Sequence, residues 1–385
     1  MEGDFDSRHW VIGLILTGYV KKFWYGWCIK GCAFCSNLWG KTMLNLILSF
    51  TVVVVAIGCK TASESKSDPK FLFDRGPSVN QFVLDDQEQW LRSQTSNEMQ
   101  ARFDHLVVFG DSLSDQGLLN KNTFGLMVKP DTFWKSRWSN GPNWVDYVSA
   151  ALQTETMNYA VGGAETADKG NFFEGLVIPS LFSQLESFRK EKDRVNFDRT
   201  LVTIWIGPNN YFNEKNSDID LTVEDIINSV KSLKEMGAKH IVVGNMSLLG
   251  ISPSSLSGDG KSPEVLKQNT FDHNARLLEG LSSNEGLDIS LYDAFSISRD
   301  MHDNYLDYGF ETIDQPCYKG DIRGNYQGEK FCKNSMATKY WDATHPNTMM
   351  FCYYAAKFLQ DLPDSDFELS VGKSRCQELL VVDRR

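Results

Sequence analysis

Clustered positive charge is the feature that this 385-residue sequence most clearly lacks. Lys and Arg number 39 against 50 Asp and Glu, so the formal net charge is −11, and no basic run is longer than the pair Lys21–Lys22. Proteins that bind nucleic acid place Lys and Arg in clusters opposite the phosphates. The acidic balance therefore excludes nucleic acid as a partner.

Internal repeats and long low-complexity tracts are also absent. The chain is 42% apolar and 23% charged, a globular composition with ample material for a core. Its length allows one large domain or two ordinary ones. The oligomeric state is not indicated.

The first hundred residues differ in character from the rest. Trp10–Val20 is apolar but too short to span a bilayer, whereas Met43–Cys59 is an uncharged run preceded by Lys41. Its end, Ala56-Ile57-Gly58-Cys59, resembles the lipobox of bacterial lipoproteins, in which the Cys carries the lipid. An ordinary signal peptide or an uncleaved anchor is the alternative. All three predict export, either as an outer membrane lipoprotein with membrane association through Cys59 or as a secreted protein.

Apolar strand patterns alternate with helical ones from Leu106 onward. Near-continuous apolar strands separated by helices predict an α/β fold with a parallel sheet covered on both faces. Ligands of such sheets bind beyond the carboxyl ends of the strands. The predicted strands are 106–110, 157–163, 200–207, 240–246 and 287–293, and the predicted helices are 222–239, 262–281 and 345–362.

Ser112 stands directly after the first of these strands, in the stretch LVVFGDSLSDQG that runs from Leu106 to Gly117. A strand-to-loop turn is the simpler explanation for Gly-Asp-Ser at this position. The alternative is that the strand presents Ser112 as a nucleophile at the edge of the sheet. A serine nucleophile needs a base that removes its proton and a third group that orients the base.

Histidine is scarce, with six in the chain, and His345 alone stands in a motif suited to that base, Trp341-Asp342-Ala343-Thr344-His345-Pro346. A spacing of three lets the side chains of Asp342 and His345 leave one face of a turn, so that the carboxylate can hold the imidazole. A helix N-cap role for Asp342 and a surface position for His345 are the simpler alternatives.

Two further strand ends offer donors for an oxyanion, the negative charge that acyl transfer places on the former carbonyl oxygen. Asn158–Glu165 contains a Gly pair whose backbone N–H groups can face a ligand, and Trp205–Phe212 contains a side-chain amide. Strand-closing glycines and a helix-capping Asn would explain the same residues. A parallel sheet would bring these ends together with Ser112.

Four blocks in this order resemble the GDSL (SGNH) hydrolase superfamily. The resemblance implies Ser112 as nucleophile, Asp342 and His345 as acid and base, and an oxyanion hole formed by Ser112, Gly163 and Asn209. It also implies a flavodoxin-like three-layer α/β/α sandwich with a central parallel sheet, without metal or cofactor. The blocks are Phe109–Asp115, Asn158–Ala164, Gly207–Asn210 and Asp342–Pro346.

The third block departs from the usual Gly-x-Asn-Asp, because Asn210 replaces the last Asp and removes a charge beside the oxyanion residue. The character of the first hundred residues and the extent of the resemblance together divide the chain into an N-terminal extension with a signal- or lipoprotein-like segment (1–59), a polar tether with a short helical prefix (60–100), the hydrolase domain (101–365) and a C-terminal tail (366–385).

The bacterial lipolytic branch of the superfamily is the most similar: lysophospholipases, thermolabile haemolysins and glycerophospholipid–cholesterol acyltransferases. It implies a serine esterase that cleaves acyl esters of phospholipids or lysophospholipids through an acyl-enzyme, with water or an alcohol such as cholesterol as acceptor. The alternatives are a carboxylesterase for short-chain or carbohydrate acetyl esters and an inert surface binding protein. The apolar segments 124–128 and 172–182 could line an acyl groove, although a core position is slightly favoured.

Eight cysteines add two hypotheses. The spacing of Cys28, Cys32 and Cys35 resembles the iron–sulfur loop of radical S-adenosylmethionine enzymes, but it precedes the signal-like run and no barrel pattern follows. The last four, Cys317, Cys332, Cys352 and Cys376, allow three pairings. Closure of the polar loop before Asp342 favours Cys317–Cys332, and disulfide loops in acyltransferase-like relatives add to this. For Cys352 a free buried thiol is as good an interpretation as a bond to Cys376.

Overall fold

A five-stranded parallel sheet forms the centre of the computed structural model, which describes residues 95–382 except 169–171, 213–217, 259 and 285–288. The strand order β2-β1-β3-β4-β5 places β1 between the two strands that follow it in sequence. The strands are β1 (His105–Gly110), β2 (Glu155–Asn158), β3 (Thr200–Trp205), β4 (His240–Gly244) and β5 (Ile289–Tyr292).

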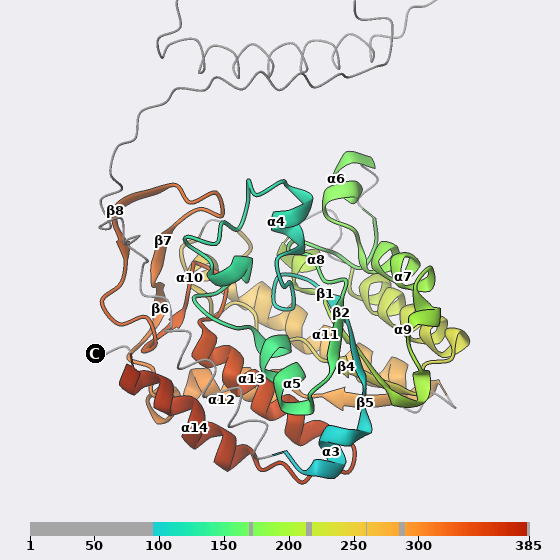
Figure 1. Ribbon diagram of the computed structural model, residues 1–385. Coiled ribbons are helices and arrows are strands. Elements are labelled where there is room, and N and C mark those ends of the chain that lie inside the picture. Colours follow the sequence, from blue (N-terminus) through green and yellow to red (C-terminus); the bar gives the residue numbers. More distant parts are fainter. Residues whose placement is uncertain (1–94, 169–171, 213–217, 259, 285–288, 383–385) are drawn as a thin grey trace, which may run out of the picture. The chain divides into compact units, whose positions relative to one another are not determined.

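Alternate side chains of each strand point to opposite faces, and each face is covered by helices (Figure 1). Leu106 and Val108 join one core cluster and Val107 and Phe109 the other. The three-layer α/β/α sandwich expected from the sequence is therefore confirmed. The first face packs on α5 (Trp144–Leu152), α12 (Ala294–Asp303) and α13 (Thr348–Asp361), and the second on α7 (Leu181–Arg189), α9 (Ile219–Met236) and α11 (Pro263–Ser283).

Shorter elements complete the described part of the chain. Around the carboxyl ends of the strands lie α4 (Leu118–Asn122), α6 (Phe172–Val177), α8 (Pro208–Phe212) and α10 (Pro253–Leu256) (Figure 1). Two small sheets pair β6 (Thr312–Pro316) with β9 (Thr338–Tyr340) and β7 (Tyr318–Gly320) with β8 (Tyr326–Phe331). The remaining elements are α3 (Asn97–Arg102), α14 (Leu369–Val382) and the 3₁₀ turns Trp134–Ser136, Lys192–Arg194, Phe197–Arg199 and Tyr305–Tyr308.

Several element boundaries differ from those expected. β2 ends at Asn158, five residues before the predicted end, because the Asn158 Oδ1 accepts the N–H of Ala160 (2.9 Å) and turns the chain out of the sheet. α9 starts at Ile219 with Asp218 as N-cap, whose carboxylate accepts the N–H of Leu221 (3.0 Å). The C-terminal segment, expected to be a tail, contains α14, which packs on α13.

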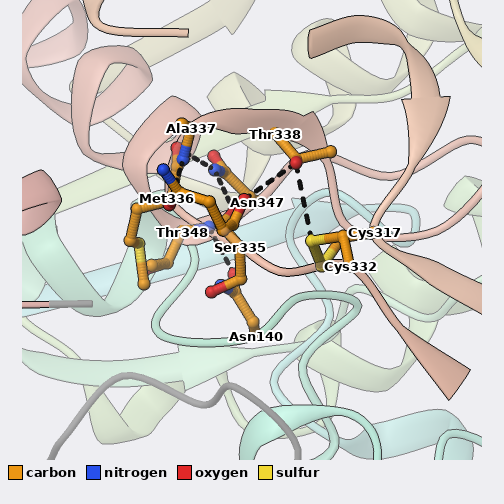
Figure 2. The surroundings of a disulfide bond; sticks show 10 residues. Asn140, Cys317, Cys332, Ser335, Met336, Ala337, Thr338, Asn347 and Thr348 are labelled. Carbon is orange, nitrogen blue, oxygen red and sulfur yellow. Dashed lines mark hydrogen bonds between the residues drawn. A yellow bond between two sulfur atoms is a disulfide. The ribbon is translucent and has the colours of Figure 1, made fainter. Parts of the chain in front are cut away.

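Both expected cysteine pairs are disulfides, so the free-thiol interpretation of Cys352 is wrong. Cys352–Cys376 joins α13 to α14. Cys317–Cys332 closes the β7–β8 hairpin, and Figure 2 shows Thr338 beside it, with its Oγ1 3.5 Å from the Cys332 Sγ.

The Cys317–Cys332 hairpin is also hydrogen-bonded to the turn that carries Asp342 and His345. The N–H of Tyr318 donates to the carbonyl of Trp341, and the N–H of Trp341 donates to the carbonyl of His345 (2.8 Å). Reduction of this disulfide is therefore expected to affect the turn through the backbone hydrogen bond between Tyr318 and Trp341.

Replacing Cys317 and Cys332 by Ser is expected to lower the free energy of unfolding by about 3 kcal/mol and to lower ester turnover. The matched control replaces Cys352 and Cys376 by Ser, which should lower stability while leaving turnover of the folded enzyme nearly unchanged. Denaturant unfolding and kcat on p-nitrophenyl butyrate measure the two effects. Equal loss of turnover in both variants would contradict the link to the turn.

Lys339, in β9, is a fully buried amine. Its Nζ makes no hydrogen bond within the described residues and lies 5.4 Å from the ring centroid of Tyr340. Burial lowers the pKa of Lys339 to about 7, against a weak opposing effect from Asp303. An unfolded Lys, with a pKa of about 10.4, binds more protons over the interval between these values, so the free energy of unfolding rises with pH there.

Replacing Lys339 by Met is expected to stabilise the protein by roughly 1–4 kcal/mol at and below neutral pH, because it removes an unpartnered buried amine at similar volume. The gain should shrink as the pH rises toward about 10, where the unfolded lysine also loses its proton. Denaturant midpoints at about pH 6 and about pH 9 test both parts. A less stable variant at the lower pH would show that the amine is charged and paired.

Candidate active site

Three side chains from two segments that are far apart in the sequence are connected by hydrogen bonds. Ser112 follows β1, and its Oγ lies 2.9 Å from the Nε2 of His345, in the turn between β9 and α13. The Nδ1 of His345 lies 2.9 Å from both carboxylate oxygens of Asp342. The structure thus brings together the three residues expected from the sequence. The helix N-cap interpretation of Asp342 is wrong, because Asn347 caps α13.

The Asp342–His345 turn is held by its own carboxylate. The Oδ1 of Asp342 accepts the backbone N–H groups of Thr344 (2.8 Å) and His345 (2.7 Å). Burial raises the pKa of Asp342, but the charge of His345 and these hydrogen bonds outweigh burial, so the pKa lies below its ordinary value. An ionised Asp342 favours the tautomer in which Nδ1 donates to the carboxylate and Nε2 is free to accept the Ser112 proton.

The proposed oxyanion donors converge from three strand ends. Ser112, Gly163 and Asn209 all line one cavity. Gly163, after β2, has a φ of 84°, a conformation that favours glycine. Asn209, on α8, donates one amide hydrogen to the carbonyl of Ala164 (2.9 Å), which ties the two loops together.

Asp115 is a structural centre of the site that the sequence interpretation missed. Its buried carboxylate accepts the N–H of Gly162 (2.9 Å), the N–H of Leu118 (2.6 Å) and the Nε1–H of Trp138 (3.2 Å). The Trp138 ring in turn packs against His345, with centroids 4.5 Å apart. Asp115 therefore links the loop of the nucleophile, the Gly162–Gly163 loop and the wall behind the base. The only sequence feature that pointed to Asp115 was its position in the first of the four blocks, Phe109–Asp115.

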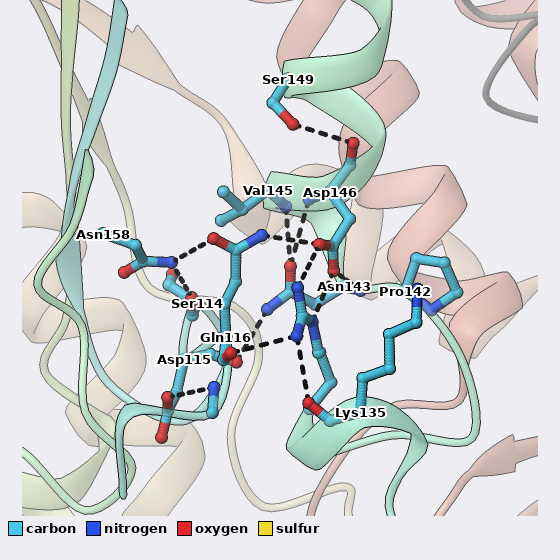
Figure 3. A network of polar contacts seen from close by, with 12 residues as sticks. Ser114, Asp115, Gln116, Lys135, Pro142, Asn143, Val145, Asp146, Ser149 and Asn158 are labelled. Atoms are coloured by element: carbon cyan, nitrogen blue, oxygen red, sulfur yellow. Dashed lines mark hydrogen bonds and ion pairs between the residues drawn. The ribbon is translucent and has the colours of Figure 1, made fainter. Parts of the chain in front are cut away.

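A second polar network holds residues 114–116, the loop that follows Ser112 (Figure 3). Arg137 donates to both carboxylate oxygens of Asp146 (2.7 and 3.1 Å) and to the carbonyl of Gln116 (3.0 Å). Asn143 donates to the carbonyl of Asp115 (3.1 Å), and Asn158 to that of Ser114 (2.8 Å). These hydrogen bonds hold the backbone of the segment that carries Ser112.

Asn210, which stands where the family usually has Asp, is linked to a carboxylate through Thr166. Asn210 accepts the N–H of Thr166 (3.2 Å) and donates to its Oγ1 (3.1 Å). The Thr166 hydroxyl then donates to the carboxylate of Asp225 on α9 (2.7 Å). The charge at position 210 itself is absent, and Asp225 is the carboxylate connected to Asn210 through Thr166.

The cavity beside Ser112 has a volume of about 420 Å³. Its walls away from Ser112 and His345 come from residues 247–255, from α11 and from α13. Of the described residues that line it, none belongs to 124–128 or to 175–182. The apolar wall is Leu113, Phe212, Leu248, Leu249, Ile251, Leu266 and Met350, and Ser247, Ser252, Ser254, Ser255 and Ser298 add hydroxyls.

Replacing Asn209 by Ala is expected to lower kcat by roughly a hundred- to thousandfold, the usual effect of losing one oxyanion donor. Asn209→Asp, which also adds a negative charge at the oxyanion, should lose at least as much. Steady-state kinetics on p-nitrophenyl butyrate, with thermal unfolding as a folding control, measure both. An Asn209→Ala enzyme with unchanged kcat would exclude the amide from the oxyanion hole.

A serine, an imidazole and a carboxylate in hydrogen-bonded order, at the carboxyl edge of a parallel α/β/α sheet and beside convergent N–H donors, define a serine hydrolase. The family model for GDSL-like Lipase/Acylhydrolase matches residues 106–350. The chain belongs to this family and is a GDSL-type serine ester hydrolase.

Curated relatives agree with this assignment. The chain is 22% identical over 302 residues to a thermolabile hemolysin of Vibrio parahaemolyticus serotype O3:K6 (strain RIMD 2210633), covering 75% of this chain and 72% of that protein. It is 26% identical over 246 residues to a phosphatidylcholine-sterol acyltransferase of Aeromonas hydrophila, covering 61% and 70%. It is 24% identical over 324 residues to a GDSL esterase/lipase of Arabidopsis thaliana, covering 66% and 86%.

Similar solved structures include a member of the lipolytic protein G-D-S-L family from Veillonella parvula DSM 2008 (TM-score 0.38, 12% identity, 66% of this chain and 96% of that chain). Another is a catalytic mutant of an acetylxylan esterase from Geobacillus stearothermophilus (TM-score 0.40, 15% identity, 69% and 95%).

The remaining sequence hypotheses concern segments outside the described residues. These are the lipobox at Cys59, the tether 60–70 and the cysteines Cys28, Cys32 and Cys35. Within the described part of the chain, no helix combines the length and apolar character needed to cross a membrane.

Proposed function

We propose that the protein cleaves acyl esters of phospholipids or lysophospholipids through an acyl-enzyme formed on Ser112. The observation that carries the proposal is the hydrogen-bonded set Ser112–His345–Asp342, in which Ser112 and His345 line a cavity with an apolar wall. The hemolysin and the phosphatidylcholine-sterol acyltransferase among the relatives support a lipid ester.

The proposed reaction starts when the Nε2 of His345 takes the proton of the Ser112 hydroxyl while Oγ attacks the ester carbonyl. The N–H groups of Ser112 and Gly163 and the second amide hydrogen of Asn209 stabilise the oxyanion. His345 then gives its proton to the departing alcohol. Water, deprotonated by His345, attacks the acyl-enzyme, and the bond between the acyl carbon and Ser112 Oγ then breaks while His345 returns the proton to Oγ, so the fatty acid leaves and Ser112 is restored. An alcohol such as cholesterol in place of water would give a new ester by the same steps.

Five serines on the cavity wall favour a second candidate, a carboxylesterase for short-chain or carbohydrate acetyl esters. Their hydroxyls would bind a polar acyl or sugar group, whereas Leu248, Leu249, Ile251 and Leu266 would bind an alkyl chain.

A substrate panel separates the two candidates. Phospholipid, lysophospholipid, acetylated xylo-oligosaccharide and p-nitrophenyl esters are compared, with and without cholesterol. Release of long-chain fatty acid is expected, and a cholesteryl ester would identify the acceptor. Turnover confined to short, water-soluble esters would refute the lipid substrate, and no turnover of any ester would indicate an inert binding protein.

We also propose export, with Cys59 as the lipid-bearing N-terminus or with secretion as the alternative. Two disulfides within the domain support this, because such bonds persist in oxidising compartments.

A further inference from the structure

Three large apolar side chains near the active site project into solvent. Phe124 is 94% exposed, Leu126 67% and Leu176 69%. Phe124 and Leu126 follow α4, and Leu176 belongs to α6. We call these three residues the apolar ridge.

The backbone holds Phe124 outward at an energetic cost. Its φ of 52° lies in the left-handed region, which costs of order 1–3 kcal/mol for such a residue. Asn120 fixes this conformation, because its carbonyl accepts the N–H of Gly125 (2.8 Å) and its amide donates to the carbonyl of Met127 (2.6 Å). A hydrogen-bonded loop thus presents Phe124 and Leu126 to the outside, where the folded chain itself gains nothing from them.

The segments that carry the apolar ridge are connected to the active site through neighbouring residues. The Asn122 amide donates to the carbonyl of Val177 at the end of α6 (3.0 Å), which ties α4 to α6. The next residue, Ile178, lies against the oxyanion loop, since a Cβ on Gly163 would be 3.4 Å from its Cδ1. Figure 1 shows α4 and α6 at the same end of the sheet as α8, which carries Asn209.

The α4 loop and the hairpin bonded to it carry more basic than acidic side chains, against the acidic balance of the whole chain. The β7–β8 hairpin joins the α4 loop through the N–H of Val128, which donates to the carbonyl of Ile322 (2.8 Å). In residues 118–135 and 318–333, the basic side chains are Lys121, Lys129, Lys135, Lys319, Arg323, Lys330 and Lys333, and the acidic ones are Asp131, Asp321 and Glu329.

From this combination we infer that the apolar ridge docks the enzyme on an anionic phospholipid surface. Phe124, Leu126 and Leu176 enter the lipid layer, and the basic side chains around them meet the headgroups. The loop that contains Gly163, which contacts Ile178, then lies beside the lipid whose ester is cleaved. The inference rests on the proposed phospholipid substrate.

Binding is tested with the full chain carrying Ser112→Ala, which leaves vesicles intact. Co-sedimentation with phosphatidylcholine vesicles, with and without phosphatidylglycerol, compares Phe124→Ser/Leu126→Ser/Leu176→Ser with the control Leu221→Ser/Leu278→Ser. The control residues are 60% and 56% exposed on α9 and α11 and do not line the cavity. Each ridge side chain is expected to contribute about tenfold in vesicle partitioning, and phosphatidylglycerol should strengthen binding.

Turnover is tested with the same substitutions in the Ser112 enzyme. The ridge variant should lose at least about tenfold in phospholipid hydrolysis on vesicles, yet keep kcat/KM on soluble p-nitrophenyl butyrate. The control variant should keep both.

Three outcomes would overturn the inference: equal vesicle binding and turnover of the ridge and control variants, attachment that needs only residues 43–59, or a protein dimer that the ridge substitutions dissociate. Vesicle binding through the ridge without any phospholipid turnover by the Ser112 enzyme would instead refute the proposed function alone.

Discussion

Ser112→Ala is expected to reduce ester turnover by about 10⁴-fold or more while the protein folds normally. The hydroxyl is the only atom lost, and its hydrogen bond within the described residues is the one to His345. Removing a triad nucleophile typically has an effect of this size or larger. The measurement is kcat on p-nitrophenyl butyrate, together with thermal unfolding.

Ser114→Ala is the matched control, two residues along the same loop. The Ser114 hydroxyl accepts the Nε1–H of Trp144 (3.1 Å) and does not line the cavity, so its loss should cost about 1 kcal/mol of stability but little turnover. His345→Ala added to Ser112→Ala should cause almost no further loss, because the two residues act as a unit. A Ser112→Ala enzyme with normal turnover would refute the site.

Gly162→Ala is expected to lower kcat by about a hundredfold through Trp138. A Cβ on Gly162 would lie 2.2 to 2.6 Å from three atoms of the Trp138 indole, so the ring must shift. That ring packs on His345 and donates to Asp115. A displacement of about 1 Å in a catalytic group commonly costs on the order of a hundredfold.

Gly260→Ala provides the comparison for this substitution. Gly260 lines the same cavity, but a Cβ there meets nothing within 4 Å, so turnover should be unchanged. Kinetics and thermal unfolding of both variants separate a shifted ring from general instability. A fully active Gly162→Ala enzyme would show that Trp138 does not position the base.

The residues that carry chemistry were predictable because their motifs are local. Asp342 and His345 are three residues apart, and their geometry depends on one turn. Ser112 follows a strand whose apolar run is unmistakable. The spatial meeting of these segments followed from the parallel sheet, in which successive strand ends share one edge.

Residues whose role depends on tertiary contacts were not predictable. Asp115 accepts N–H groups from two other loops, and Asp225 reaches the oxyanion loops through Thr166. The end of β2 was misjudged because Tyr159–Gly163 keeps an apolar character after the chain has left the sheet. For 124–128 a core position was slightly favoured, and it holds for Val128, which is buried, but not for Phe124 and Leu126, which are exposed.

The separation of Ser112 and His345 by 233 positions affects when the enzyme becomes active during its synthesis. The nucleophile is synthesised well before the base, so no nascent chain that ends before position 345 carries a working ester-cleaving centre. The disulfide hairpin beside the base is completed only under oxidising conditions. The order of the two segments along the chain therefore delays assembly of the ester-cleaving centre until position 345 has been synthesised.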